Sequence, residues 1–135
     1  MEIILAGMKY FITTILLATT ISLQAQVEHN FEMEPSNTNC HELPEKFDSP
    51  SQAIDVIEKS TFRLTQSIKI SRYYSPKAAF FYSCDGQTGY LIVDLKDDRR
   101  KIYQNIPQEV WDEFSNTNDP IGYYSTHIDK KYESL

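Results

Sequence analysis

The chain has 135 residues, of which 41% are hydrophobic and 24% are charged, and its formal net charge at pH 7 is −6. This length suits one domain with a single core. With this acidic balance the protein lacks the strong positive field that would attract nucleic-acid phosphates, so nucleic acid is not the expected partner. The basic clusters at residues 99–101 and 130–131 are more typical of solvated turns and helix ends than of a binding patch.

The front of the chain, from Met8 on, has the layout of a secretory signal peptide. The cation Lys9 precedes an apolar run over residues 10–21, and Ala25 offers a small residue at a cleavage point. The run is shorter than the roughly 20 apolar residues that a membrane-spanning helix needs. We therefore expect residues 1–25 to be a cleaved signal peptide, with translation starting at Met1 or Met8. The mature protein is then secreted or periplasmic, without a membrane anchor. An uncleaved anchor and a buried core helix are the alternatives.

Two cysteines, Cys40 and Cys84, are present. In a small exported domain an even number of cysteines favours a disulfide, and we predict that these two are paired. The alternatives are a reactive thiol at Cys84 and a metal site that uses Cys40, His41 and Glu42. Neither alternative has enough partners at metal-like spacing, so no metal and no cofactor are expected.

Residues 26–46 are polar and contain two prolines, which predicts an extended arm held at Cys40. One α+β domain is expected over residues 47–135. It opens with a helix that Ser49 caps, that has Pro50 in its first turn and that ends near residue 60. The apolar face of this helix consists of Ala53, Ile54 and Ile57.

Four strands are predicted next, at residues 62–70, 78–84, 90–95 and 101–106, because apolar and polar residues alternate there or apolar residues dominate. Asp85 followed by Gly86 is a strong signal for the turn between the second and third strands. In the fourth strand, the period of two predicts two sets of side chains on opposite faces. One set is Ile102 and Ile106, and the other is Lys101, Tyr103 and Asn105.

Two helices are predicted at the end of the chain. Pro107 opens the first, whose apolar stripe is Val110, Trp111 and Phe114. The second starts at Asp119 and Pro120, and its expected inward residues are Ile121, Tyr124, Ile128 and Tyr132. The order of elements predicts an α+β fold, in which a small antiparallel sheet of three to four strands packs with one N-terminal helix and two C-terminal helices.

Residues 82–86 read Tyr-Ser-Cys-Asp-Gly, and residues 102–111 read Ile-Tyr-Gln-Asn-Ile-Pro-Gln-Glu-Val-Trp. With these segments the chain resembles the KTSC domain, a small bacterial family named for its occurrence at the C-terminus of some lysyl-tRNA synthetases. The resemblance covers roughly residues 78–132, and the family also includes exported single-domain proteins. It implies little about activity: the role of the family is unknown, and RNA binding has been suggested. The family's Tyr-x-Tyr pattern falls on Lys101 and Tyr103, so its first tyrosine is missing here.

The sequence contains no nucleophile motif, no phosphate-binding glycine loop and no zinc-binding spacing, so we expect no enzymatic activity. The candidate ligand-binding surface combines Tyr103 and Asn105 with Tyr82 and Tyr123, because tyrosine offers contact area and a hydroxyl at low entropic cost. The alternative is that these rings cover the sheet against the arm and the last helix.

The sequence thus predicts an exported, non-enzymatic binding module whose partner is a protein or a component of the cell envelope. RNA binding, implied by the resemblance, is one alternative. A small thiol-dependent or hydrolytic enzyme is the other.

Overall fold

The computed structural model describes residues 38–135, so the predicted signal peptide and most of the predicted arm lie outside the described residues. The helical elements are η2 (Cys40–Glu42), α2 (Pro50–Lys59), α3 (Gln108–Asn116), α4 (Pro120–Tyr123) and the π-helix η3 (Tyr124–Asp129). The strands are β1 (Leu64–Lys69), β2 (Ala78–Ser83), β3 (Thr88–Asp94) and β4 (Arg100–Pro107). Among these residues, no helix has both the length and the apolar character needed to cross a membrane.

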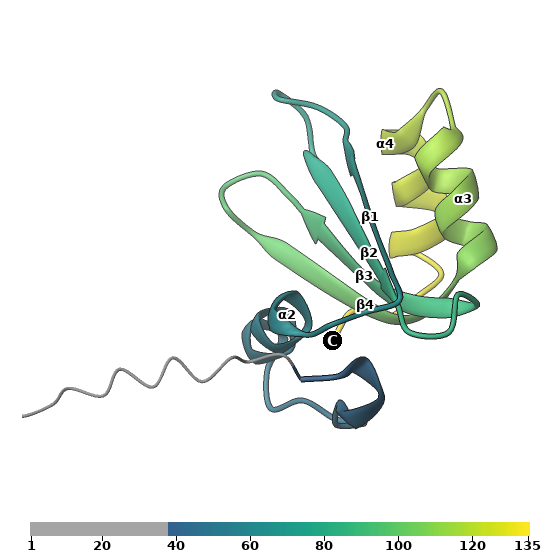
Figure 1. The fold of residues 1–135 in the computed structure, drawn as a ribbon. Helices are drawn as coiled ribbons and strands as arrows, with labels where there is room; N and C mark the ends of the chain where they lie inside the picture. Colours follow the sequence, from purple (N-terminus) through teal and green to yellow (C-terminus); the bar gives the residue numbers. More distant parts are fainter. Residues whose placement is uncertain (1–37) are drawn as a thin grey trace, which may run out of the picture. The chain divides into compact units, whose positions relative to one another are not determined.

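The four strands form one antiparallel sheet in the order β1-β2-β3-β4, so each strand pairs with its neighbour in the sequence (Figure 1). Helix α2 packs on one face of this sheet, called here the α2 face. The C-terminal helices α3, α4 and η3 pack on the opposite face, called the α3 face. The predicted α+β class and its arrangement of helices are therefore confirmed.

The α3 face holds the larger core. Alternate residues of β2 and β3 point into it and are fully buried, as the period of two predicts. Trp111 of α3 stacks on Phe81 with ring centroids 5.3 Å apart, and its Nε1 donates a hydrogen bond to Gln66 Oε1 at 2.7 Å. This bond satisfies the indole N–H, so the largest side chain of the core is buried without an unpaired donor.

The α2 face is covered over only part of its area. Ala53, Ile54 and Ile57 of α2 pack on Ile92 of β3 and Ile102 of β4. Farther across the sheet, Phe80 and Tyr82 of β2 are half-buried. The β1 residues on this face, which pair with β2, are exposed: Thr65, Ser67 and Lys69. The half of this face that β1 and β2 form is therefore open.

Residues 38–46, the described part of the predicted extended arm, belong to the same compact unit as the rest of the described chain. Thr38 and Cys40 bond with the backbone of Thr61 at 2.9 Å and 3.1 Å, respectively. Leu43 packs against the α2 cluster, as does Phe47 at the start of the predicted domain. The segment is ordered because its few apolar residues are used in the core.

The last helical segment differs from the prediction in two ways. It begins as one turn of α-helix and continues as a π-helix, and Ile121 is 36% exposed instead of inward. Tyr123 faces the core, where its ring stacks on Phe114 with centroids 5.8 Å apart. Because successive residues of a helix are rotated by about 100°, Ile121, two positions earlier, points to nearly the opposite side and faces outward. The inward positions of Tyr124 and Ile128 are confirmed, since both are buried.

Candidate functional site

A β-bulge in β4 determines where the predicted ligand-binding residues lie. Leu91 pairs with Tyr103, but Gly89 pairs with Ile106, so β4 has one residue more than β3 over this stretch. Asn105 takes the extra position with a left-handed backbone, φ +57°. Ile106 consequently joins Tyr103 in the α3-face core, while Ile102 lies on the α2 face. The prediction that Ile102 and Ile106 share a face, with Tyr103 and Asn105 together on the other, is wrong because the period of two fails at a bulge.

Tyr103 is fully buried on the α3 face, beneath η3. Its hydroxyl donates to Asp129 Oδ1 at 2.8 Å and accepts from the Tyr124 hydroxyl at 2.7 Å. Lys101 Nζ donates to the same Asp129 oxygen at 2.9 Å. Burial, followed by the bond with Tyr124, raises the pKa of Tyr103 well above its usual range, whereas the bonds from Lys101 and Tyr103 lower the pKa of Asp129. Tyr103 is thus part of an internal polar network and does not contact the surface.

Tyr123 lies elsewhere again. It is half-buried on α4, its ring stacks on His127 at 4.4 Å, and its hydroxyl donates to Glu113 Oε2 at 2.8 Å. Burial and this bond raise the pKa of Tyr123 to about 12. Its polar group is already used to join α4 to α3.

Asn105 and Tyr82, by contrast, come together in one hollow of about 180 Å³ on the α2 face. We call this hollow the disulfide groove. It is lined by Cys40, Phe62, Tyr82, Cys84, Asp85, Thr88, Gly89, Tyr90 and Asn105. The bulge therefore separates Asn105 from Tyr103 and places it with Tyr82, a pairing that the strand pattern did not predict.

The walls of the disulfide groove are aromatic. The Phe62 ring packs against Tyr82 at 5.4 Å and against Tyr90 at 6.2 Å. Partial burial raises the pKa of both tyrosines, because it disfavours the charged phenolate. A Cβ at Gly89 would collide with the Tyr82 carbonyl and the Phe81 ring, so this position requires glycine. The sequence analysis did not single out Phe62, Gly89 or Tyr90, because they are brought together only by the strand register.

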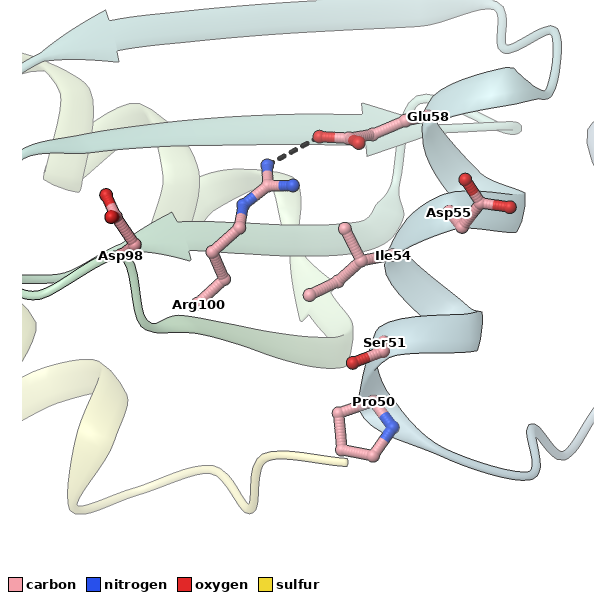
Figure 2. A pocket seen from close by; sticks show the side chains of 7 residues that line it. All are labelled: Pro50, Ser51, Ile54, Asp55, Glu58, Asp98 and Arg100. Carbon is pink, nitrogen blue, oxygen red and sulfur yellow. Dashed lines mark hydrogen bonds and ion pairs between the residues drawn. The ribbon is translucent and has the colours of Figure 1, made fainter.

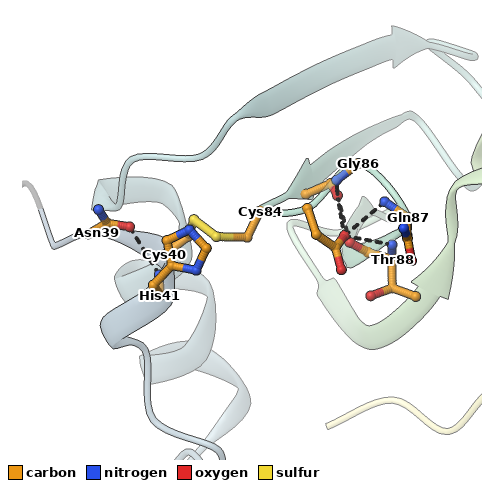
Figure 3. The surroundings of a disulfide bond; sticks show 9 residues. Asn39, Cys40, His41, Cys84, Gly86, Gln87 and Thr88 are labelled. Atoms are coloured by element: carbon orange, nitrogen blue, oxygen red, sulfur yellow. Dashed lines mark hydrogen bonds between the residues drawn. A yellow bond between two sulfur atoms is a disulfide. The ribbon is translucent and has the colours of Figure 1, made fainter.

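One end of the groove is fixed by the predicted disulfide between Cys40 and Cys84, which is confirmed (Figure 3). The Cα atoms are 5.8 Å apart, and the bond closes a loop between positions 44 residues apart in the sequence. Both cysteines of the chain are used, so Cys84 is not a free thiol. The bond ties η2 to the end of β2, and both of its cysteines line the groove together with Phe62 and Tyr82.

His41 lies beside the disulfide, and its ligand nitrogen and the two sulfurs all lie within 4.8 Å of one another (Figure 3). Such a set suits a soft metal ion only when both sulfurs are thiolates. In the disulfide state they are bonded to each other, so only the imidazole is available. Glu42, the third ligand of the predicted alternative, does not belong to this group.

The rim next to Cys84 is a rigid turn. Asp85 Oδ1 accepts hydrogen bonds from the backbone N–H of Gln87 at 2.8 Å and of Thr88 at 3.0 Å. These two bonds lower the pKa of Asp85, and Gly86 follows it with φ +77°. The predicted turn at Asp85 and Gly86 is therefore confirmed. The carboxylate of Asp85 stabilises this turn by accepting the two backbone hydrogen bonds.

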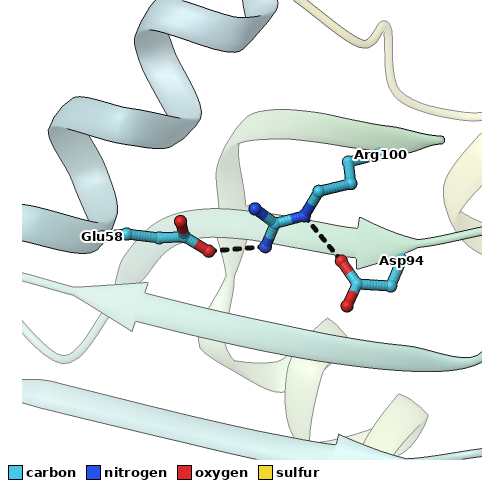
Figure 4. A network of polar contacts seen from close by, with 3 residues as sticks. All are labelled: Glu58, Asp94 and Arg100. Atoms are coloured by element: carbon cyan, nitrogen blue, oxygen red, sulfur yellow. Dashed lines mark hydrogen bonds and ion pairs between the residues drawn. The ribbon is translucent and has the colours of Figure 1, made fainter. Parts of the chain in front are cut away.

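A second hollow, of about 340 Å³, lies between α2 and the start of β4 (Figure 2). Arg100 lines it and donates from its guanidinium to Glu58 of α2 and, at 2.7 Å, to Asp94 of β3 (Figure 4). Asp55, which also lines the hollow, pairs with Lys59 at 2.8 Å. Because its cation is neutralised by two carboxylates, this hollow is best understood as the anchor of α2 on the sheet.

Comparison of the chain with family models, with curated proteins and with solved structures gives no match.

Proposed function

We propose that this protein is an exported, non-enzymatic binding module, similar to the KTSC domain, that recognises a protein partner through the disulfide groove. The observation that carries this proposal is the position of Asn105. Its side chain is exposed at the aromatic hollow and makes no hydrogen bond with any other residue of the described chain. An amide can donate and accept at once, which suits the N–H and C=O of a peptide group.

The dimensions of the groove suggest what the partner presents. A hollow of about 180 Å³ with walls from Phe62, Tyr82 and Tyr90 has room for a single apolar side chain. The amide of Asn105 would then bind the backbone beside that side chain. We therefore propose that the ligand is an extended segment of an exported or envelope protein, anchored by one apolar residue.

Two observations support a binding role over a catalytic one. Both sulfurs at the groove are bonded to each other, which removes the thiolate that a thiol enzyme needs. Asp85, the carboxylate that lines the groove, accepts two backbone N–H bonds and has a lowered pKa, which is unsuited to a general base. Export is supported by the signal-like segment of the sequence and by the disulfide, which persists in oxidising compartments.

The test uses N-acetyl-leucinamide, a capped amino acid that presents one apolar side chain between two amides. We expect titration of this probe into the full chain to shift the backbone NMR signals of Tyr82, Tyr90 and Asn105. Asn105→Gly should abolish these shifts, because it removes the amide while glycine tolerates the positive φ of this position.

Asn118→Gly is the matched control, since Asn118 is an exposed asparagine of the α3–α4 loop, away from the groove. It should leave the titration unchanged. The proposal fails if the probe shifts no groove signals, or if the shifts in Asn105→Gly equal those in the wild type.

A further inference from the structure

The β1–β2 hairpin, defined here as residues 61–83, has a charge opposite to that of the rest of the described chain. It contains the four cations Arg63, Lys69, Arg72 and Lys77 and no carboxylate. The other described residues contain eight basic and fifteen acidic side chains. The net negative charge of the protein is therefore an average over two regions of different sign.

The cations of the hairpin are free of ion pairs within residues 38–135. Lys59, Arg100 and Lys101, in contrast, are each paired with a carboxylate at 2.9 Å or less. The alternation of β1 places Lys69 together with Thr65 and Ser67 on the open half of the α2 face. Unpaired cations gathered on one hairpin create a local positive potential on an acidic molecule.

The tip of the hairpin presents two aromatic rings to solvent. Tyr73 is 76% exposed and Tyr74 is 66% exposed, more than any other large hydrophobic side chain of the described residues. The turn beneath them is ordered: Ser71 Oγ accepts from the N–H of Tyr73 at 3.1 Å and of Tyr74 at 3.0 Å. Neither ring lines the disulfide groove or the hollow at Arg100. The rings thus project from a convex tip, which cannot enclose a small ligand.

We propose that this tip docks on an anionic lipid surface, with the rings of Tyr73 and Tyr74 at the level of the headgroups and with Lys69, Arg72 and Lys77 against the lipid phosphates. Tyrosine is enriched at the membrane–water interface because its ring is apolar and its hydroxyl is polar. Basic residues near such a surface are attracted by its negative potential. A flat anionic interface matches a convex tip that combines both kinds of side chain. A single-stranded nucleic acid would instead favour the aromatic rings of the sheet face, and Phe80 and Tyr82 are half-buried there.

The test is sedimentation of the full chain with vesicles made of equal parts of phosphatidylglycerol and phosphatidylcholine, and with vesicles of phosphatidylcholine alone. We expect binding to the anionic vesicles, weakening as salt is added. Lys69→Glu with Arg72→Glu should weaken it about tenfold or more. Tyr73→Ser with Tyr74→Ser, which keeps the charge, should weaken it as well, because the rings no longer enter the interface.

Lys130→Glu with Lys131→Glu is the matched control, because it makes the same change of charge at an exposed site outside the hairpin. Residues 1–25 are common to all variants, so the differences between variants isolate the hairpin. Equal binding by the control and the hairpin variants overturns the proposal, as does equal binding to both kinds of vesicle. Retention of single-stranded RNA that depends on the same cations, without binding to vesicles, also overturns it, in favour of a nucleic-acid partner.

Discussion

Helices cover the two faces of the sheet to different extents. On the α3 face, alternate residues of β2 and β3, together with Tyr103 and Ile106 of β4, are buried under three helical segments. On the α2 face, one helix covers Ile92 and Ile102, and β2 keeps half-buried rings beside exposed β1 residues. The same strands therefore present a closed face and a half-open face.

The polar groups show what this difference means for function. On the α3 face, the hydroxyls of Tyr103 and Tyr124 and the carboxylate of Asp129 bond to one another. On the α2 face, the amide of Asn105 and the ammonium group of Lys69 have no partner within residues 38–135. Groups that are hydrogen-bonded inside the protein stabilise the fold, whereas exposed groups without a partner are free to bind a ligand.

The largest expected effect comes from breaking the support of the α2 face. Cys40→Ser with Cys84→Ser should lower the free energy of unfolding by about 4 kcal/mol, because the unfolded chain is no longer constrained between positions 44 residues apart. Urea unfolding followed by circular dichroism measures this loss. Reduction of the wild type with a dithiol is the control and should reproduce it. A loss well below 1 kcal/mol in both experiments would mean that the disulfide contributes little to stability.

A smaller effect is expected from removing hydrogen bonds of the polar network on the α3 face. Tyr103→Phe keeps the ring but removes the hydroxyl that bonds to Tyr124 and Asp129, which should cost about 1–3 kcal/mol in unfolding free energy. The matched control is Tyr132→Phe, since the Tyr132 hydroxyl makes no hydrogen bond within the described residues. It should stay near the wild type in the same urea titration. Equal stability of the two variants would show that the network adds nothing beyond packing.

Much of the fold follows from local signals in the sequence. The start of α2 was predictable because Ser49 Oγ accepts from the N–H of Gln52 at 3.1 Å, and Pro50 occupies its usual place in the first turn. The four strands and the turn at Asp85 were predictable because alternation and turn residues act over a few positions. The disulfide followed from the expected compartment and the even number of cysteines.

The candidate site was only partly predictable, because it depends on the bulge. One extra residue in β4 reverses the face of every side chain after it, and the period of two contains no sign of this. The one local hint is that Asn105 tolerates a positive φ better than most residues do. The cationic hairpin was missed for a related reason. Its cations are spread over residues 63–77, and the sequence does not show that the ion pairs of the described chain are made by other cations.

The smallest expected effect compares one carboxylate from each region as the pH falls. The pKa of Asp129 is lowered first by Lys101 and then by Tyr103, so its ionised form stabilises the folded state. That contribution is complete above the unfolded pKa of about 4 and is lost as the pH falls through the lower folded value. Asp129 is partly exposed, so solvent screening should keep the contribution below about 1 kcal/mol. Asp129→Asn should therefore be slightly less stable than the wild type at neutral pH and should lose less stability on acidification.

Asp85→Asn serves as the comparison, measured by urea unfolding at neutral pH and at a pH below 4. The pKa of Asp85 is lowered chiefly by hydrogen bonds from the N–H groups of Gln87 and Thr88 and not by an ion pair. Added salt should therefore reduce the effect of Asp129→Asn, which depends on the ion pair with Lys101, more than that of Asp85→Asn. If salt reduces the stability changes of both variants equally, the ion pair with Lys101 does not account for the contribution of Asp129 to stability.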